Sequence, residues 1–144
     1  MSTRPDDPTD LVGLWLSWKR AHEALRSGVI RDVSEHSDLP EAELTVLIHL
    51  RGAGGTLRQN ALTAATGWDR GRLSHLLTRM ESQGLAQRSR LRNGVQISIQ
   101  PAGTQALDRA DGALRLALQQ HLAAPLTGEQ LRHLRAVLDA LLSS

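Results

Sequence analysis

The stretch from Thr66 to Leu85 constrains the fold more than any other part of this chain, because its pattern predicts one well-bounded amphipathic helix. Four apolar residues recur at i, i+3, i+4 and i+7, which puts them on one face of a helix. They are Leu73, Leu76, Leu77 and Met80. Asp69 is suited to cap the start of the helix with its side-chain oxygen, and Gly84 to end it in the left-handed conformation.

The opposite face of this helix is polar and basic, and no residue between Asp69 and Glu81 is acidic. Short hydrogen-bonding side chains and arginines on an exposed helix suit the base edges in the major groove of DNA. An ordinary solvated surface helix has a similar composition, so both interpretations stand on this stretch alone. The residues that would read bases are Arg70, Arg72, Ser74, His75, Thr78 and Arg79.

A β-hairpin is predicted directly after this helix. Asn93-Gly94 separates two strand-like segments, and both residues tolerate the positive φ of a type I′ turn. Arginines recur at every second position before and into the turn, so we expect them to project from one face. They are Arg88, Arg90 and Arg92. This arrangement favours contact with phosphates or a minor groove, and the alternative is protection of an edge strand by charge.

The segment before the helix completes a recognisable unit. Thr56 and Gln59 have the spacing of a capping box, which predicts a helix that runs to Thr66 and is followed by a turn at Gly67. A helix, a short glycine turn, a second helix and a basic hairpin are the order of a winged helix-turn-helix. Arg58 then joins the wing arginines as a candidate phosphate contact.

Four blocks of sequence carry a resemblance to the MarR family of bacterial transcriptional regulators. They are LPEAELTVLIHL (39–50), LRQNALTAATGWDRGRLSHLLTRMESQGLAQR (57–88), ISIQPAGTQAL (97–107) and LTGEQLRHLRAVLDAL (126–141). The resemblance implies an intertwined dimer that binds duplex DNA and responds to a small effector. One departure is the wing, which in the family has a longer tip with an acidic residue. Here only Leu91 to Gly94 link the strands, and none of these is acidic.

Length and composition exclude several classes of protein. The 144 residues are one domain's worth of chain, and the lack of cysteine excludes a disulfide framework, a thiolate zinc site and a cysteine redox switch. No apolar run reaches the length of a membrane-spanning helix, and the first residues lack the order of a signal peptide, so we expect a cytoplasmic protein. Residues 1–8 are expected to be disordered.

Charge is concentrated in one segment. The chain has a net charge of +2, but residues 56–92 carry seven arginines against Asp69 and Glu81, which gives +5 there and −3 for the remainder. A localised basic segment is typical of an anion-binding face. The chain has no Phe or Tyr, so stacking on single-stranded bases is poorly supported and duplex DNA is favoured.

Helices are predicted on both sides of the winged unit. One runs from residue 9 or 10 to about Ser27, is broken by Gly28 and resumes to about His36. Another begins near Pro40 and ends in the glycine-rich linker Gly52 to Gly55. A long helix is expected from about Thr104 to Ala124, and a capping box at Thr127 opens a last helix.

We therefore predict a mainly α fold with a small β-hairpin wing. The winged helix-turn-helix lobe would span residues 39–103, and residues 9–38 with 104–144 would form a helical dimerisation region. The terminal helices carry more leucine and tryptophan than one small lobe needs, which indicates a homodimer. A dimer would place two recognition helices about 34 Å apart and read a palindromic site.

The resemblance implies that an effector would lie near Trp18, His22 and Arg26, which are one helical turn apart, with Trp15 beside them. Packing in the core or an interface is the alternative role of the two tryptophans. We find no candidate catalytic residues, metal ligands or cofactor motif, since the six histidines show no paired ligand spacing. The predicted function is a DNA-binding transcriptional regulator, most often a repressor in this family. The alternative is a winged-helix protein-interaction or scaffold module without sequence-specific DNA binding.

Overall fold

The structure, a computed structural model, describes residues 7–144. Of the predicted disordered segment 1–8, residues 1–6 lie outside the described residues, and Asp7 accepts a hydrogen bond of 2.8 Å from the backbone N–H of Thr9. The chain divides into two compact units. One unit spans Ser34–Ala113, and the other combines the chain up to Val33 with Leu114–Ser144.

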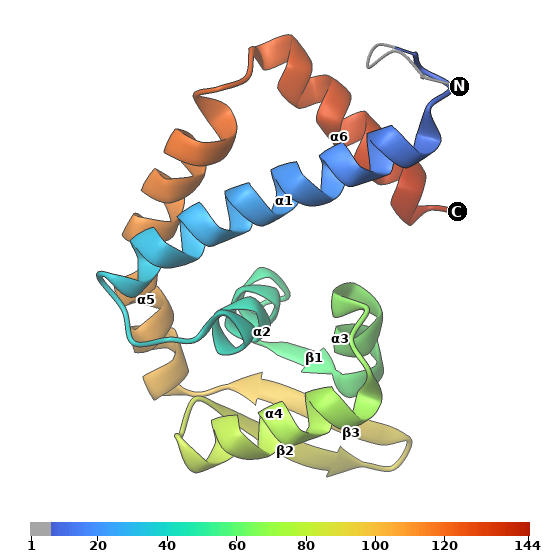
Figure 1. Cartoon of the computed structure of the whole chain (residues 1–144). Coiled ribbons are helices and arrows are strands. Elements are labelled where there is room, and N and C mark those ends of the chain that lie inside the picture. The colour runs from blue at the N-terminus through green and yellow to red at the C-terminus, as the bar shows by residue number, and fades with distance from the viewer. Residues whose placement is uncertain (1–6) are drawn as a thin grey trace. The chain divides into compact units, whose positions relative to one another are not determined.

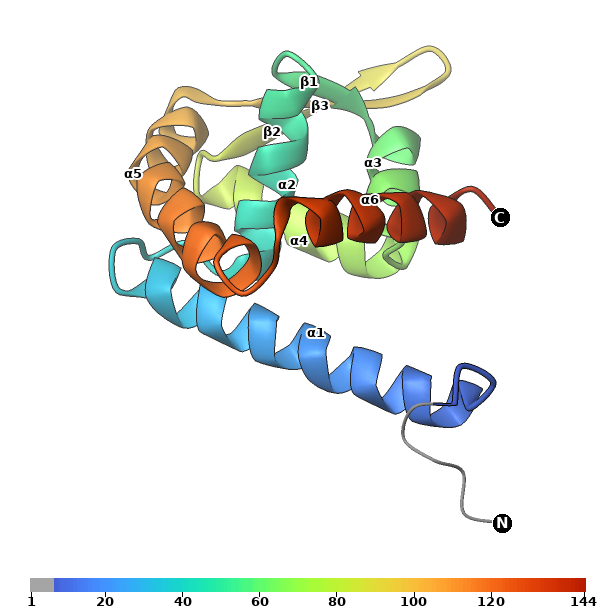
Figure 2. The same ribbon diagram turned by 90° about the horizontal axis from the view of Figure 1, so that it is seen from above.

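The unit Ser34–Ala113 is a winged helix. Its elements are α2 (Glu41–Gly52), β1 (Thr56–Arg58), α3 (Gln59–Thr66), α4 (Arg70–Ser82), β2 (Ala86–Leu91), β3 (Gly94–Ile99) and the first part of α5 (Pro101–Leu118). The strands form an antiparallel sheet in the order β1-β3-β2. The hairpin of β2 and β3 projects from the helices of this unit (Figures 1 and 2). The predicted fold class, mainly α with a small wing, is confirmed.

The core of this unit consists of aliphatic side chains from every helix and from β3. The face of α4 predicted to be buried is buried, which confirms its periodicity. The core residues are Leu44, Leu47, Leu50, Leu62, Leu73, Leu76, Leu77, Met80, Ile97 and Leu107. Because α4 lies on this core by one face, its opposite face is left at the surface.

Both ends of α4 form as predicted. The Asp69 carboxylate accepts hydrogen bonds from the backbone N–H groups of Gly71 at 2.6 Å and Arg72 at 3.2 Å. These two donors have no partner within the first helical turn, so the cap satisfies them. After the helix, Gly84 has a φ of +72°, which a residue with a side chain rarely adopts.

The capping box predicted at Thr56 is wrong. Thr56 belongs to β1, where it pairs with Ser98, and Leu57 pairs with Ile97. The helix begins instead at Gln59, with Arg58 as an N-cap residue that makes no side-chain capping hydrogen bond. Thr56 is taken up by a third strand because the edge of β3 offers it backbone partners. A three-residue strand is too short to show a period in the sequence.

The turn of the hairpin also differs from the prediction. Leu91 pairs with Gly94, so Arg92 and Asn93 form the tip and Gly94 already belongs to β3. Asn93 does not have a positive φ, whereas type I′ requires one at both central residues. The side chain of Asn93 instead accepts a hydrogen bond of 2.9 Å from Arg58.

The second unit contains α1 (Leu11–Ser34), the end of α5, the π-helical turn η1 (Gln119–Ala123) and α6 (Gly128–Leu142). The capping box at Thr127 and Gln130 is confirmed. Among the described residues, no helix is both long and apolar enough to cross a membrane.

The break predicted at Gly28 is wrong, because α1 continues through it to Ser34. A β-carbon at this position would lie 2.9 Å from the ring of His121, so the glycine permits a close approach and does not end the helix. His121 lies in η1 and its Nε2 is 2.7 Å from a carboxylate oxygen of Asp32. The hydrogen bond from His121 is the main reason that the pKa of Asp32 is lowered.

The long helix predicted from Thr104 to Ala124 has different ends. It begins three residues earlier, with Pro101 as its first residue, where the fixed φ of proline is suited to a helix start. Its α-helical part stops at Leu118, and the π-helical turn η1 carries the chain on to Ala123.

Candidate nucleic-acid interface

The outer face of α4 presents polar and basic side chains. Arg70, Arg72, His75, Thr78 and Arg79 are exposed and Ser74 is half-buried. The guanidinium of Arg72 lies 4.8 Å from the centre of the Trp68 ring, which is a cation–π distance. This contact supports Arg72 at the start of the helix without neutralising its charge, and so leaves its N–H groups able to donate to another partner.

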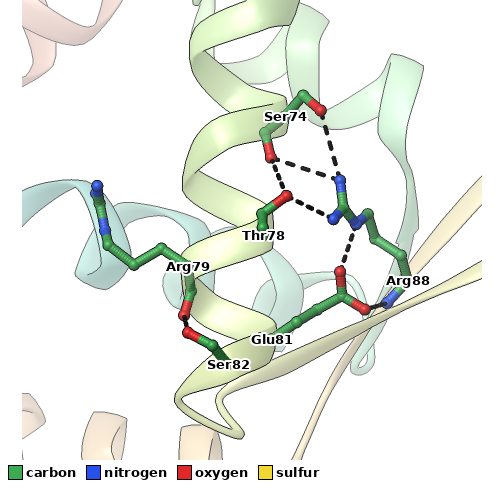
Figure 3. A network of polar contacts seen from close by, with 6 residues as sticks. All are labelled: Ser74, Thr78, Arg79, Glu81, Ser82 and Arg88. Carbon is green, nitrogen blue, oxygen red and sulfur yellow. Dashed lines mark hydrogen bonds and ion pairs between the residues drawn. The ribbon is translucent and has the colours of Figure 1, made fainter.

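Arg88 connects the wing to this helix. Its Nε donates to Glu81 at 2.6 Å and its Nη2 to the hydroxyl of Thr78 at 2.7 Å, while Nη1 lies 3.4 Å from the carbonyl oxygen of Ser74. Figure 3 shows the guanidinium lying against α4 between these partners. The hydrogen bond from Arg88 is the main reason that the pKa of Glu81 is lowered. Arg88 thus links β2 to α4, and it occupies the hydroxyl of Thr78 as a hydrogen-bond acceptor.

The other two wing arginines are placed differently. Arg90 pairs with Val95 across the hairpin and Arg92 lies at its tip, and both are exposed. The spacing of the three arginines predicts that they project together, but the side chain of Arg88 folds onto α4 (Figure 3). The exposed positive charge of the hairpin is therefore concentrated toward its tip.

Arg79 also has a carboxylate partner. Its Nη2 lies 2.8 Å from Glu43 of α2, whose side chain is only 1% exposed, while the side chain of Arg79 is 57% exposed. In Figure 3 Arg79 points away from the cluster around Arg88. Glu43 was not predicted from the sequence, although Glu43, Leu47 and Leu50 are spaced as i, i+4 and i+7 and so share a buried face.

Arg58 and Arg70 line one small pocket. Its volume is about 230 Å³, and the residues lining it are Arg58, Gln59, Asn60, Arg70, Asn93, Gly94 and Val95. Arg58 donates to the side-chain oxygen of Asn93 at 2.9 Å, and Arg70 donates to that of Asn60 at 3.3 Å. The sequence did not predict either asparagine as a partner of these arginines, because an exposed amide carries no signal of its partner.

The predicted effector residues do not all line one cavity. Trp18 and His22 line a mainly apolar cavity of about 340 Å³ within the unit of α1, η1 and α6, where His121 and several leucines complete the wall. Trp15 is 59% exposed and Arg26 pairs with Glu23 at 3.4 Å, and neither lines this cavity. Between residues 7 and 144, no group of three or more His, Cys, Asp or Glu side chains is arranged to hold a metal ion.

The MarR family model matches residues 37–94. AbsC, a MarR family transcriptional regulator from Streptomyces coelicolor, has a similar structure with a TM-score of 0.83 and 23% identity, over 96% of this chain and 95% of AbsC. Sco3205, a MarR family regulator from the same organism solved in complex with DNA, has a TM-score of 0.82 and 24% identity, over 94% and 90% of the two chains.

A probable transcriptional regulator from Pseudomonas aeruginosa is 27% identical, with a TM-score of 0.74 over 92% of this chain and 97% of that one. A search of curated proteins found no match. The similarity to these structures extends over both units, beyond the residues that the family model matches.

Proposed function

We propose that this chain is a member of the MarR family and a dimeric regulator of transcription that binds double-stranded DNA of a specific sequence. The observation that carries the proposal is the exposed face of α4, where Arg72 and His75 stand beside a basic wing. The major groove of DNA is wide enough to admit one α-helix. A guanidinium that reaches a guanine there can donate two hydrogen bonds to it. One such pair would discriminate against a wrong base by about 1–3 kcal/mol.

The wing supports the same proposal. Arg90 and Arg92 are exposed on the hairpin beyond the brace made by Arg88, so they would contact the backbone or enter a minor groove while α4 lies in the major groove. Sco3205, which has the same fold, was solved with DNA bound. Contacts of this kind would fix the position of the protein on the duplex and leave discrimination between sequences to α4.

A homodimer is supported by the apolar surface of the unit of α1, η1 and α6. Large side chains are exposed along α1 and at the end of α6, among them Trp15, Leu141 and Leu142 at 59%, 61% and 84%. Apolar surface of this extent usually packs on another chain. A two-fold dimer would carry two α4 helices and read a palindromic operator whose half-sites are about one helical turn apart.

Occupation of a promoter by this dimer would block or alter transcription. We infer a repressor that acts in the cytoplasm, because repression is the commoner mode of the family that the chain resembles. A small molecule would release it by binding better to a form in which the two α4 helices no longer match the operator. The cavity lined by Trp18 and His22 is the candidate effector site in the described residues. The proposed role is regulatory and includes no catalytic step.

The test is selection of bound duplexes from a random DNA pool at about 0.15 M salt, where non-specific phosphate binding is weakened. We expect enrichment of an inverted repeat with half-sites about ten base pairs apart. Binding to that repeat should fall steeply as salt is raised. If a preparation refolded without small molecules enriches no duplex, the proposal is wrong and the winged unit serves another partner.

A further inference from the structure

The pocket lined by Arg58, Asn60, Arg70 and Asn93, hereafter the two-arginine pocket, is built for an anion. We propose that it holds one phosphate of the DNA backbone, between the start of α4 and the tip of the wing. This inference rests on the proposed function. It assigns Arg70 to a phosphate, whereas the position of Arg70 on α4 alone indicates a base contact in the major groove.

Three parts of the winged unit meet at this pocket. Arg58 lies at the junction of β1 and α3, Asn60 lies in the first turn of α3, and Arg70 is the first residue of α4. Asn93 comes from the hairpin tip and is 35 positions away from Arg58 in the sequence. The pocket, with a volume of about 230 Å³, is thus bounded by the base-reading helix on one side and the wing on another.

The partners of the two arginines are neutral. Arg58 donates to the amide oxygen of Asn93 and Arg70 to that of Asn60. An amide oxygen orients a guanidinium but leaves its positive charge in place. Three other arginines of this unit are paired with carboxylates instead. These pairs are Arg51 with Asp108, Arg79 with Glu43, and Arg88 with Glu81.

No acidic residue is among the described residues that line the two-arginine pocket. Asp69 precedes Arg70 in the chain, but its carboxylate accepts from the backbone N–H groups of Gly71 and Arg72 and caps α4. Two like charges beside one cavity attract an anion. Guanidinium groups bind phosphate through paired N–H donors, and the described contacts use one N–H group of each.

The position of the pocket favours a phosphate of DNA over a free one. On duplex DNA the sugar-phosphate backbone separates the major groove from the minor groove. If α4 lies in the major groove and the wing tip approaches the minor groove, the backbone between them passes the pocket. A phosphate held there would fix the register of α4 on the bases, since contacts to phosphates position a protein on the duplex.

The test uses isosteric charge changes in the full dimer. Asn93→Asp and Asn60→Asp keep the shape and the hydrogen-bond acceptor but add a carboxylate beside each arginine. We expect each of them, and Arg58→Gln, to weaken operator binding by roughly tenfold. Gln105→Glu, which adds the same charge at an exposed position of α5 in the same unit, is the matched control and should weaken it far less.

Duplexes with one methylphosphonate, which removes the charge of a single phosphate, complete the test. For the parent protein, one position in each half-site should lose roughly tenfold in affinity. At that position Arg58→Gln should cost little more, because both changes remove the same interaction. If Arg58→Gln causes the same additional loss of affinity at every methylphosphonate position, the inference is wrong. It is also wrong if Asn93→Asp binds the operator as tightly as Gln105→Glu does.

Two further outcomes remain distinct. If the parent binds no duplex, the proposed function is wrong, and so is the assignment of the two-arginine pocket to a phosphate of DNA. If the parent binds duplex without a methylphosphonate-sensitive position near the pocket, but inorganic phosphate shifts the side-chain N–H resonances of Arg58 and Arg70, the pocket holds a free anion. That result would overturn the backbone assignment and leave the DNA-binding function intact.

Discussion

At the scale of single residues, the arginines of the winged unit differ in the partner that each one meets. Arg79 and Arg88 face the carboxylates of Glu43 and Glu81, so much of their charge is neutralised inside the protein. Arg72 lies over the ring of Trp68 and Arg90 is exposed on the wing, and both keep their charge available. Substitutions at these positions should therefore have different effects on DNA binding.

Replacement of Arg72 and of Arg90 should separate base reading from phosphate binding. Arg72→Ala should reduce the preference for the operator over other sequences by about 1–3 kcal/mol. Arg90→Ala should weaken binding to all sequences and lower the slope of log affinity against log salt by about 0.9 for each phosphate that is no longer neutralised. Titration of operator and scrambled duplexes over a range of salt measures both effects. Arg132→Ala, an exposed arginine of α6, is the control.

If Arg72→Ala and Arg90→Ala both bind like the parent protein, the docking geometry proposed for α4 and the wing is wrong. A uniform loss for Arg72→Ala would instead make it a phosphate-binding residue and move the base-reading role to His75 and Thr78.

The N-cap of α4 should be worth about 1 kcal/mol of stability. Asp69→Ala removes the acceptor for the N–H groups of Gly71 and Arg72, whereas Asp69→Asn keeps an acceptor of the same shape. Urea unfolding at a fixed protein concentration should therefore show a lower midpoint for the alanine variant and a nearly unchanged one for the asparagine variant. Equal loss in both variants would mean that the charge of Asp69 matters and not its capping geometry.

At the scale of elements, packing decides what a glycine does within one helix. Gly103 and Gly112 both lie in α5. A β-carbon on Gly103 would collide with the carbonyl oxygen of Leu85, whereas a β-carbon on Gly112 would meet nothing within 4 Å. The first glycine allows α5 to approach the chain at the start of the hairpin, and the second only weakens the helix.

Alanine at these two positions should change stability in opposite directions. Gly112→Ala should raise the free energy of unfolding by about 0.5–1 kcal/mol, because alanine loses less backbone entropy in a helix. Gly103→Ala should lower it by about 1–3 kcal/mol, because backbone must move to admit the methyl group. Denaturant unfolding of the two variants beside the parent measures both. A stabilised Gly103→Ala would contradict the close approach of α5 to Leu85.

The brace between β2 and α4 should make stability depend on pH in the acid range. The pKa of Glu81 lies below its ordinary value of 4.5 in the folded protein, chiefly because Arg88 donates to its carboxylate. As the pH falls, the carboxylate of Glu81 therefore takes up a proton at a higher pH in the unfolded chain than in the folded protein. The ion pair of Arg88 with Glu81 should contribute its full stabilisation above the ordinary pKa of Glu81. That contribution should be lost as the pH falls through the pKa that Glu81 has in the folded protein.

Glu81→Gln tests this, because an amide of the same shape does not titrate there. The variant should be less stable than the parent at pH 7, and the difference should shrink as the pH falls below about 4. Unfolding by urea at several pH values gives the comparison, and Glu35→Gln, an exposed acid of the same unit, is the control. A constant difference across pH would show that the ion pair does not contribute.

At the scale of the whole molecule, the apolar residues left exposed on α1 and α6 have the character of an interface that pairs two copies of the chain. Val137, Leu141 and Leu142 form an exposed apolar stretch at the end of α6, while Arg132 lies on its polar face. Reading of a palindrome requires this pairing, because one winged unit covers only a half-site.

Charges placed on that stretch should produce a monomer. The double variant Leu141→Glu and Leu142→Glu would bury two unpaired carboxylates in the interface, which is strongly unfavourable. Sedimentation velocity should show the mass of one chain for this variant and of two chains for the parent, and affinity for the palindrome should fall while a single half-site is still bound weakly. Arg132→Glu, on the polar face of α6, should remain a dimer. An unchanged mass for the double variant would exclude the end of α6 from the interface.

Elements whose signals are local in the chain could be predicted from the amino-acid sequence. The spacing of Leu73, Leu76, Leu77 and Met80 sets which face of α4 is buried, because the helical period is a property of the backbone. The exposed face with Arg72 and His75 follows from the same period. The caps at Asp69 and Thr127 lie within three residues of their partners, so they could also be predicted.

Features whose partners are distant in the chain depend on tertiary contacts and could not be predicted. Thr56 has the same capping pattern as Thr127 but forms a strand, because β3 supplies it with a partner 42 positions later, at Ser98. The helix α1 continues through Gly28, where the ring of His121 occupies the space that a β-carbon would need. Arg58 meets Asn93 and Arg79 meets Glu43 across 35 and 36 positions. Such pairs depend on long-range tertiary contacts. Neither the secondary-structure propensity of the residues nor the hydrophobic periodicity of the sequence indicates which distant residues will meet.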